Sequence, residues 1–192
     1  MPHSIQAARP KLRATGTALR ALAVLGILAG CAAVVPASTY RDAGVPISSK
    51  AFFEPDRYIG LWHEVARFPV PFQSDCPRAT AEYGLQTDGS LSVRNICRNA
   101  DGSEKSRITG SATITGPGRL VVRFDGLPFI AADYWVLWVD EGYRTAVVGS
   151  PNGRSGWILN RDPEIPPDRL RAARDILRFN GYDVSQLMEM TP

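Results

Sequence analysis

Histidine and cysteine are scarce in this sequence, and long apolar runs are missing. The 192 residues include two histidines and three cysteines, and no two cysteines form a Cys-x-x-Cys pair. Zinc sites are built largely from His and Cys ligands, so no zinc site is expected here. The Gly-x-Ser-x-Gly motif of serine hydrolases is absent, and Gly149-Ser150-Pro151-Asn152-Gly153 lacks the Lys-Ser/Thr of a phosphate-binding loop. The sequence therefore predicts no metal and no cofactor, and it favours a protein that is not an enzyme.

The first 30 residues are basic and then briefly apolar. They contain four Lys and Arg residues and no acidic residue. The apolar run from Ala21 to Ala29 is far shorter than the ~20 residues needed to cross a bilayer, so the layout is that of a secretory signal. Leu28-Ala29-Gly30-Cys31 resembles the lipobox of bacterial lipoproteins, which implies cleavage before Cys31 and lipidation of its thiol. An ordinary signal peptide with an incidental cysteine is the alternative.

Removal of residues 1–30 changes the charge balance. The remaining 162 residues carry 18 basic and 19 acidic side chains, a net charge of −1, without a basic block. Nothing in this balance favours nucleic-acid binding. The length suits one domain with a sizeable core. We therefore expect a signal peptide at 1–30, a lipidated Cys31 with a flexible tether at 31–52, and a folded domain at 53–192.

After the tether, the sequence consists of short β-rich runs that end in turn residues. Thr87-Asp88-Gly89-Ser90 is the strongest local signal, because Asp-Gly supplies the positive φ angles of a tight hairpin. A Pro-rich loop at 69–77 is unsuited to a central strand and is expected to cover one end of the domain. Eight strands are predicted, at residues 62–68, 79–86, 91–98, 106–115, 120–124, 133–139, 143–149 and 156–161.

One helical pattern follows these runs. Pro166-Pro167 opens it, apolar residues recur on one face, and Asn180-Gly181 is a suitable C-terminal stop. Such a helix buries its apolar stripe against the outside of the sheet, and residues 133–139 offer apolar side chains on both faces. Closing the sheet removes its exposed edges. The predicted fold class is all-β: an eight-stranded antiparallel up-and-down β-barrel with one C-terminal α-helix packed outside.

Three short motifs resemble the signatures of the lipocalin family. Gly60-Leu61-Trp62 enters the first strand after a short helical turn, Asp133-Tyr134 begins the sixth strand, and Arg161 ends the eighth. The resemblance extends from about Phe53 to the C-terminus, and it points to bacterial outer-membrane lipoprotein lipocalins and, more distantly, to apolipoprotein D. It implies that Gly60, Trp62 and Arg161 form the barrel floor, with the arginine stacked on the tryptophan.

The same resemblance implies a ligand and a location. It implies binding of a fatty acid or lysophospholipid in the barrel, for lipid transport, storage or membrane maintenance. With the lipobox in front, and Ala32 rather than Asp after Cys31, the expected place is the cell outer membrane, lipid-anchored and facing the periplasm. A monomer or weak dimer is expected. His63 and the pair Cys76 and Cys97 depart from the bacterial pattern, which leaves the ligand class open.

Strand alternation predicts which side chains face the barrel interior. With Trp62 inward at the floor, Glu64 and Ala66 follow it, whereas Arg67 points to water. On the other strands, the parity that sends charge outward leaves an inward set that is mostly apolar or aromatic, as in small-molecule pockets. The residues expected to bind the ligand are Tyr83, Val93, Asn95, Phe124, Tyr134, Val136, Trp138 and Trp157.

Polar groups among the inward residues leave several interpretations open. For Glu64 and Tyr134, an internal hydrogen bond is favoured over contact with a ligand's head group. Cys76 and Cys97 are expected to form a disulfide, and the alternative is two separate buried thiols. A free Cys97 in the lumen is the candidate nucleophile of an isomerase-type lipocalin, which pairing with Cys76 removes. A structural envelope lipoprotein whose barrel is filled by its own side chains is a third possibility.

Overall fold

The computed structural model describes Met1, residues 39–127 and residues 129–190. The expected signal peptide, apart from Met1, and the predicted lipidation site Cys31 lie outside the described residues. In the part of the chain that is described, no helix is long and apolar enough to cross a membrane.

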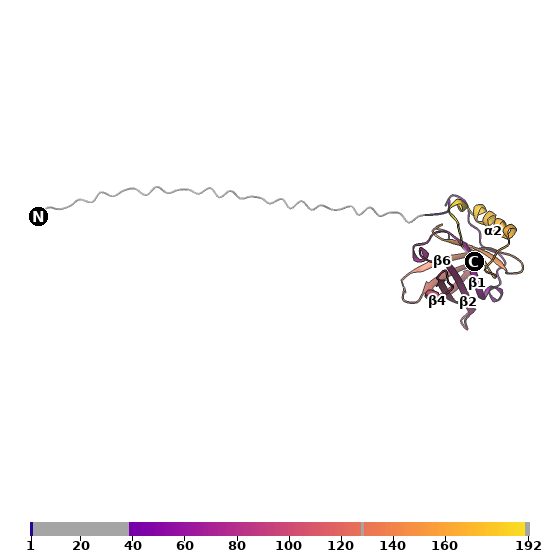
Figure 1. The fold of residues 1–192 in the computed structure, drawn as a ribbon, viewed down its shortest axis with the longest axis horizontal. Coiled ribbons are helices and arrows are strands. Elements are labelled where there is room, and N and C mark those ends of the chain that lie inside the picture. The colour runs from indigo at the N-terminus through magenta and orange to yellow at the C-terminus, as the bar shows by residue number, and fades with distance from the viewer. Residues whose placement is uncertain (2–38, 128, 191–192) are drawn as a thin grey trace. The chain divides into compact units, whose positions relative to one another are not determined.

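Eight strands of the described chain form a closed antiparallel barrel (Figure 1). They are β1 (Gly60–Arg67), β2 (Arg78–Leu85), β3 (Leu91–Arg98), β4 (Glu104–Gly116), β5 (Arg119–Phe124), β6 (Ala131–Val139), β7 (Thr145–Gly149) and β8 (Gly156–Asn160). Each strand pairs with the next along the chain, and β1 closes the sheet by pairing with β8 and β2. A short extra strand, β9 (Met188–Glu189), pairs with the end of β1. The predicted up-and-down barrel is therefore confirmed.

The hairpin turns form where turn residues were predicted. Gly89 has a φ of +81°, and the carboxylate of Asp88 accepts a hydrogen bond from the Ser90 amide at 2.9 Å. Gly118, in the β4–β5 turn, has a φ of +62°, and a Cβ atom there would lie 2.9 Å from the backbone oxygen of Val136. Gly118 is thus required both by its backbone angle and by the close approach of a neighbouring strand.

Strands β1 and β6 each contain a register shift. In β1 the shift lies between Glu64 and Ala66, and in β6 it lies between Val136 and Trp138. A β-bulge sets two residues of one strand against one residue of its neighbour, so the alternation of faces reverses beyond it. A side chain that lies beyond either shift therefore faces the side of the sheet opposite to the one that simple alternation predicts.

The helix α2 (Pro167–Phe179) lies outside the barrel, over β6, β7 and β8 (Figure 1). Ala173 and Leu177 are fully buried in a cluster that includes Val147 and Ile158 on the outer face of the sheet. Gly181, with a φ of +84°, follows the helix as its predicted C-terminal stop. The predicted helix and its packing are confirmed. The shorter helical turns are α1 (Pro55–Tyr58), η1 (Pro71–Gln73) and η2 (Val184–Gln186).

Residues 40–50 pack along the outside of the barrel. The Tyr40 ring stacks on Phe68 with 4.9 Å between ring centroids, and the Lys50 amide donates to the Val136 carbonyl at 2.8 Å. The expectation of a flexible tether over 31–52 is thus corrected for this described part of it. Aromatic and backbone contacts with distant residues hold the segment in place, and these contacts leave no local pattern in the sequence.

The two ends of the barrel differ in the connections that they carry. We call the end at which β1 begins the floor; α1 and the β2–β3, β4–β5 and β6–β7 turns lie there. We call the opposite end the mouth; the β1–β2, β3–β4, β5–β6 and β7–β8 connections surround it. The Pro-rich segment that was expected to cover one end is the β1–β2 connection, so it lies at the mouth.

Candidate functional site

Arg161 closes the floor against Trp62. Its guanidinium carbon lies 3.8 Å from the centroid of the Trp62 ring, which is a cation–π contact. The same guanidinium donates to the carbonyls of Leu61 at 2.8 Å and Ile59 at 3.0 Å. Gly60 permits this approach, because a Cβ atom there would lie 3.3 Å from Arg161 Nη1 on a backbone with a φ of +93°. The structure thus brings the three predicted floor residues together.

Three tyrosines form a hydrogen-bonded cluster next to the floor. The hydroxyl of Tyr134 lies 2.7 Å from that of Tyr58 and accepts a hydrogen bond from that of Tyr83 at 2.8 Å. Burial raises the pKa of all three side chains, so each hydroxyl keeps its proton. The Tyr134 hydroxyl therefore makes internal hydrogen bonds, the interpretation that the sequence favoured.

A second polar cluster is buried nearer the mouth. Glu64 Oε2 lies 3.4 Å from Arg67 Nη1, and both side chains are almost fully buried. Gln73 Nε2 donates to Glu64 Oε1 at 2.9 Å, and Gln73 Oε1 accepts from Trp157 Nε1 at 3.2 Å. Arg67 also donates to the Cys76 carbonyl at 2.7 Å. Burial raises the pKa of the Glu64 carboxyl, although Gln73 and Arg67 act in the opposite direction.

The position of Arg67 corrects the predicted parity of β1. Arg67 was expected to point to water, but it is 2 % exposed and pairs opposite Trp157. Ala66, expected inward, pairs opposite Ile158 and packs in the outer cluster. The register shift after Glu64 is the physical reason, because it reverses the faces of the residues that follow.

Trp138 is displaced in the same way. It pairs opposite Val147 and packs against the outer cluster beneath α2, whereas Val136 and Val139 both face the interior. Three steps along an unbroken strand would set Val136 and Val139 on opposite faces, so the shift between them reverses the alternation. The expectation that Trp138 lines the lumen is wrong.

The other predicted lining residues belong to the interior of the barrel. Tyr83, Val93 and Val136 are buried there, and Phe124, Tyr134 and Trp157 are partly buried against the same cluster. Asn95 pairs opposite Ala81, which belongs to the interior cluster. Within the described ranges, the Asn95 side-chain oxygen and Arg67 Nε are buried without a hydrogen-bond partner. These residues come from β2, β3, β5, β6 and β8, so they surround the interior on several sides. Their contact with a ligand stays a prediction.

Cys76 and Cys97 form the predicted disulfide. It joins the β1–β2 connection to the end of β3, with 5.6 Å between the two Cα atoms. The alternative of two separate thiols is therefore wrong. With its sulfur in this bond, Cys97 no longer offers the thiolate that the isomerase-type alternative requires.

The members of the two polar clusters that were missing from the predicted site residues and from the predicted inward set are Tyr58, Arg67 and Gln73. Gln73 lies in η1, within a Pro-rich segment whose sequence has no period that predicts side-chain direction. Tyr58 lies in the four-residue helix α1, and the aromatic residue shortly before Gly60 was the one available signal. Arg67 was assigned to the outer face because the register shift in β1 was not foreseen. No residue of β1 indicates that shift in the sequence.

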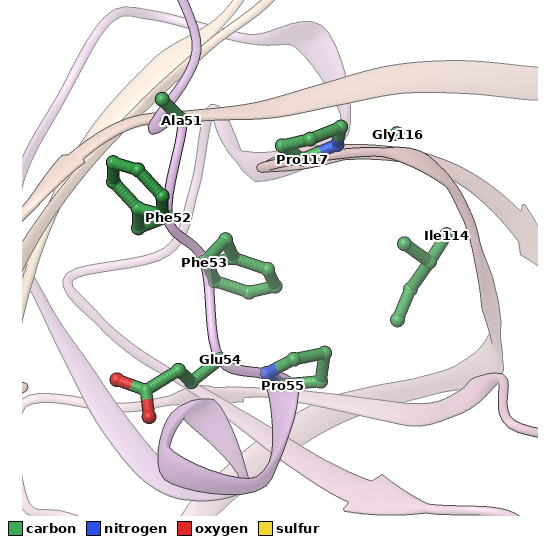
Figure 2. Close-up of a pocket in the computed structure, with 8 residues that line it drawn as sticks. All are labelled: Ala51, Phe52, Phe53, Glu54, Pro55, Ile114, Gly116 and Pro117. Carbon is green, nitrogen blue, oxygen red and sulfur yellow. The ribbon is translucent and has the colours of Figure 1, made fainter.

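A hollow of about 510 Å³ lies at the floor end. It is lined by residues 51–55 together with Ile114, Gly116 and Pro117. Figure 2 shows the Phe53 ring projecting into this hollow while the Glu54 carboxylate points away from it. None of the predicted ligand-binding residues lines it, although Phe53 and Ile114 pack against the interior cluster to which those residues belong.

Possible metal ligands are dispersed over the fold. Among the described residues, no group of three or more His, Cys, Asp and Glu side chains lies close enough together to hold a metal ion.

The model of the lipocalin-like domain family matches residues 53–192. The chain belongs to the lipocalin family. This lipocalin is 37 % identical over 139 residues to outer membrane lipoprotein Blc of Escherichia coli K12, which covers 71 % of this chain and 77 % of the relative. It is 32 % identical over 168 residues to outer membrane lipoprotein Blc of Citrobacter freundii, which covers 86 % of this chain and 93 % of the relative. It is also 34 % identical over 145 residues to bovine apolipoprotein D, across 70 % of this chain and 75 % of that protein.

Solved structures of the same fold agree with this assignment. Insecticyanin from Manduca sexta superposes with a TM-score of 0.60 at 18 % identity, covering 77 % of this lipocalin and 86 % of that chain. Lobster apocrustacyanin A1 gives a TM-score of 0.56 at 16 % identity, covering 71 % and 78 %. At these identities the likeness establishes the fold alone, and the predicted lipocalin barrel is confirmed.

Proposed function

We propose that this lipocalin binds a single-chain lipid, a fatty acid or a lysophospholipid, inside the barrel. The observation that carries the proposal is the division of the lumen into an apolar interior and a polar end. Val93, Leu120 and Val136 are buried in the apolar interior, and Glu64, Arg67 and Gln73 form the polar cluster near the mouth. An acyl chain matches the apolar interior, and its head group matches the polar cluster.

The two unpartnered polar atoms support an anionic head group. Arg67 Nε is a buried donor, and Asn95 Oδ1 is a buried acceptor. Buried polar atoms ordinarily have a hydrogen-bond partner, and a carboxylate or phosphate oxygen is a strong partner for a guanidinium. Asn95 then accepts from a hydroxyl of the glycerol in a lysophospholipid.

The location is proposed from the sequence in front of the barrel and from the relatives. The relatives from E. coli and C. freundii are named outer membrane lipoproteins. Leu28-Ala29-Gly30-Cys31 supplies a lipobox in this chain. We infer that residues 1–30 are removed and that Cys31 is lipidated. The barrel is then anchored in the outer membrane, faces the periplasm, and carries or scavenges lipid there.

Native mass spectrometry of residues 32–192, exported to the periplasm without the lipid, tests the binding proposal. The expected result is a stoichiometric fatty acid or lysophospholipid, identified after organic extraction. Trp157 and Trp138 provide a matched pair, because both are partly buried but only Trp157 faces the lumen. Trp157→Leu should reduce the bound fraction, and Trp138→Leu should leave it unchanged. A protein that stays free of ligand when lipids are added would instead favour a filled structural barrel.

The anchor has a separate test. Cys31→Ser is expected to yield soluble periplasmic or uncleaved protein in place of a membrane-bound form, as measured by cell fractionation. Globomycin, which blocks the lipoprotein signal peptidase, should stop the processing of the wild type. Processing that is insensitive to globomycin would refute the lipoprotein assignment and leave the lipid-binding proposal untouched.

A further inference from the structure

We propose that the mouth of this lipocalin docks on the surface of the lipid bilayer in which Cys31 is anchored. The contact is made by two apolar connections: Phe72 in η1 on one side, and Leu127, Phe129 and Ile130 in the β5–β6 connection on the other. The inference rests on the lipid anchor proposed above, and it adds the face of the barrel that meets the membrane.

The side chains of these two connections are exposed to a degree unusual for large apolar groups. Phe72 is 70 % exposed and Phe129 is 99 % exposed, and Leu127 and Ile130 are also exposed. Apolar side chains that point away from a protein mark surfaces that meet a partner or a membrane when they gather in one place. The β3–β4 connection at the same end is polar instead, with Asn99, Asp101 and Ser103 hydrogen-bonded to one another.

The chain leaves the described fold at the mouth. The Tyr40 amide donates to the Gly153 carbonyl at 2.7 Å, in the β7–β8 connection. The Tyr40 hydroxyl donates to the Pro69 carbonyl at 2.7 Å, in the β1–β2 connection. Arg41 donates to the Pro151 carbonyl at 3.1 Å. Thr39, the first residue of the described segment, is therefore fixed at the rim of the mouth.

The order of the strands places the apolar connections beside this exit. Around the closed barrel the strands run in the order β5-β6-β7-β8-β1-β2. The β7–β8 connection, which holds Tyr40 and Arg41, thus lies between the β5–β6 and β1–β2 connections. The two connections that carry exposed apolar side chains flank the exit, and the polar β3–β4 connection lies across the mouth from it.

The length of chain between Cys31 and the folded domain favours docking by the mouth over docking by the floor. Cys31 and Thr39 are eight Cα–Cα steps apart, which reach at most ~29 Å when fully extended. The eight residues of β1 span seven steps, a rise of about 23 Å from floor to mouth. The floor also exposes apolar residues such as Phe52 and Leu85. Docking by the floor would consume most of this reach along the side of the barrel, whereas docking by the mouth consumes almost none.

This orientation has a consequence for the exchange of ligand. Interfacial apolar side chains enter the boundary between head groups and acyl chains of a bilayer. With the mouth on that boundary, a single-chain lipid passes from the bilayer into the lumen without crossing open water. The Pro-rich β1–β2 connection, which carries both Phe72 and the lumen residue Gln73, then lies between the membrane and the barrel interior.

Quenching by brominated lipids tests the docking. The lipidated full-length product is purified from membranes as Phe129→Trp and as Phe52→Trp, a control at the floor that is 87 % exposed. Each is reconstituted in vesicles of phosphatidylethanolamine and phosphatidylglycerol, with or without brominated acyl chains. Fluorescence is compared with that of the parent protein. The tryptophan at 129 should lose most of its added emission in brominated vesicles, and the tryptophan at 52 should lose little. Ile130→Trp is a second reporter in the same connection.

Equal quenching at residues 129 and 52, or none at either, would overturn the proposal. So would an emission shift of the residue 129 reporter that depends on protein concentration and not on bromination, because a second copy would then cover the mouth. The mass of the Cys31 peptide, measured on the same samples, shows whether the anchor is present. An unlipidated Cys31 contradicts the proposed anchor, whereas an unquenched reporter on lipidated protein contradicts only the docking.

Discussion

Arginine is used differently at the two ends of the barrel. At the floor, Arg161 lies on the ring of Trp62 and donates through Nε, Nη1 and Nη2 to backbone carbonyls. At the mouth, Arg67 pairs with Glu64 and donates to two carbonyls, but its Nε has no partner in the described structure. Each guanidinium nitrogen of Arg161 thus donates to a carbonyl of the protein itself. Arg67 Nε, in contrast, remains a hydrogen-bond donor for a ligand.

The difference separates stability from binding. At the floor, Arg161 and Trp62 close the barrel. The guanidinium nitrogens of Arg161 already donate to backbone carbonyls, so no donor of Arg161 remains for a ligand. A buried cluster with unpartnered polar atoms lowers the stability of the fold. Buried polar atoms in native structures ordinarily have a hydrogen-bond partner, and a bound ligand would supply one here. We therefore expect substitutions at the floor to act mainly on folding, and substitutions at the mouth to act mainly on ligand binding.

The largest effect is expected from Trp62→Ala. Trp62 is fully buried, and its Nε1 donates to the Tyr58 carbonyl at 2.8 Å. Removing a buried tryptophan leaves a cavity and costs about 4 kcal/mol of unfolding free energy. Urea unfolding followed by circular dichroism measures this change. Trp138→Ala, outside the barrel and half-buried, serves as the control and should cost clearly less. Equal costs would show that the floor holds no special place in the stability of the fold.

Loss of the disulfide is expected to rank second. Cys76 and Cys97 are separated by 21 residues. On the chain-entropy account, closing a loop of this length stabilises the fold by roughly 3 kcal/mol. The double change of Cys76 and Cys97 to Ser should lower the midpoint of thermal unfolding accordingly, and reducing agent should have the same effect on the wild type. If reductant leaves the midpoint unchanged, the bond does not stabilise the mouth.

Arg161→Met comes third and probes the saturated floor directly. The change removes a cation–π contact and several charge-assisted hydrogen bonds, with an expected loss of about 2 kcal/mol. Arg67→Met should lose more ligand than Arg161→Met, because Arg67 has an unpartnered donor. Native mass spectrometry on both variants measures the bound fraction, and chemical unfolding measures the stability that each variant loses. Equal loss of ligand in the two variants would contradict the difference between the two ends.

The smallest effect is a pH dependence at Glu64. Burial raises the pKa of this carboxyl above its ordinary value of 4.5, so the folded state binds a proton more readily than the unfolded state. The resulting stabilisation is fully present below pH 4.5 and is lost as the pH rises through the raised pKa. Unfolding measured across the acid range should show the wild type gaining stability relative to Glu64→Gln as the pH falls. A constant difference between the two proteins would contradict the raised pKa.

Much of the fold was predictable because hairpins and helix ends are local. Asp88-Gly89 predicted its turn, the period of residues 170–177 predicted the face of α2, and an even pair of cysteines predicted the disulfide. Gly60, Trp62 and Arg161 were placed by resemblance, and the structure brings them into contact. The lumen wall was predicted on strands β2, β3 and β5, where alternation is unbroken through the residues chosen.

The wrong predictions concern residues that follow the register shifts and segments whose sequence has neither helical nor strand periodicity. Both alternating sets of β6 are apolar, so no contrast in polarity revealed that Trp138 lies outside. Gln73 and the residues from Tyr40 to Lys50 take their positions from contacts with distant parts of the chain.

The sequence by itself determined the all-β barrel, its outer helix and its floor, because each depends on periodicity, turn chemistry or a short motif. It left open whether Cys76 and Cys97 form a disulfide, and the structure shows that they do. Only the tertiary structure decided that Arg67 enters the lumen, that Trp138 leaves it, and that the chain exits beside the mouth. The physical reason is that the position of a β-bulge and the path of a packed segment depend on the packing and hydrogen bonding between neighbouring strands. The sequence of one strand alone does not reveal the energy of these interactions.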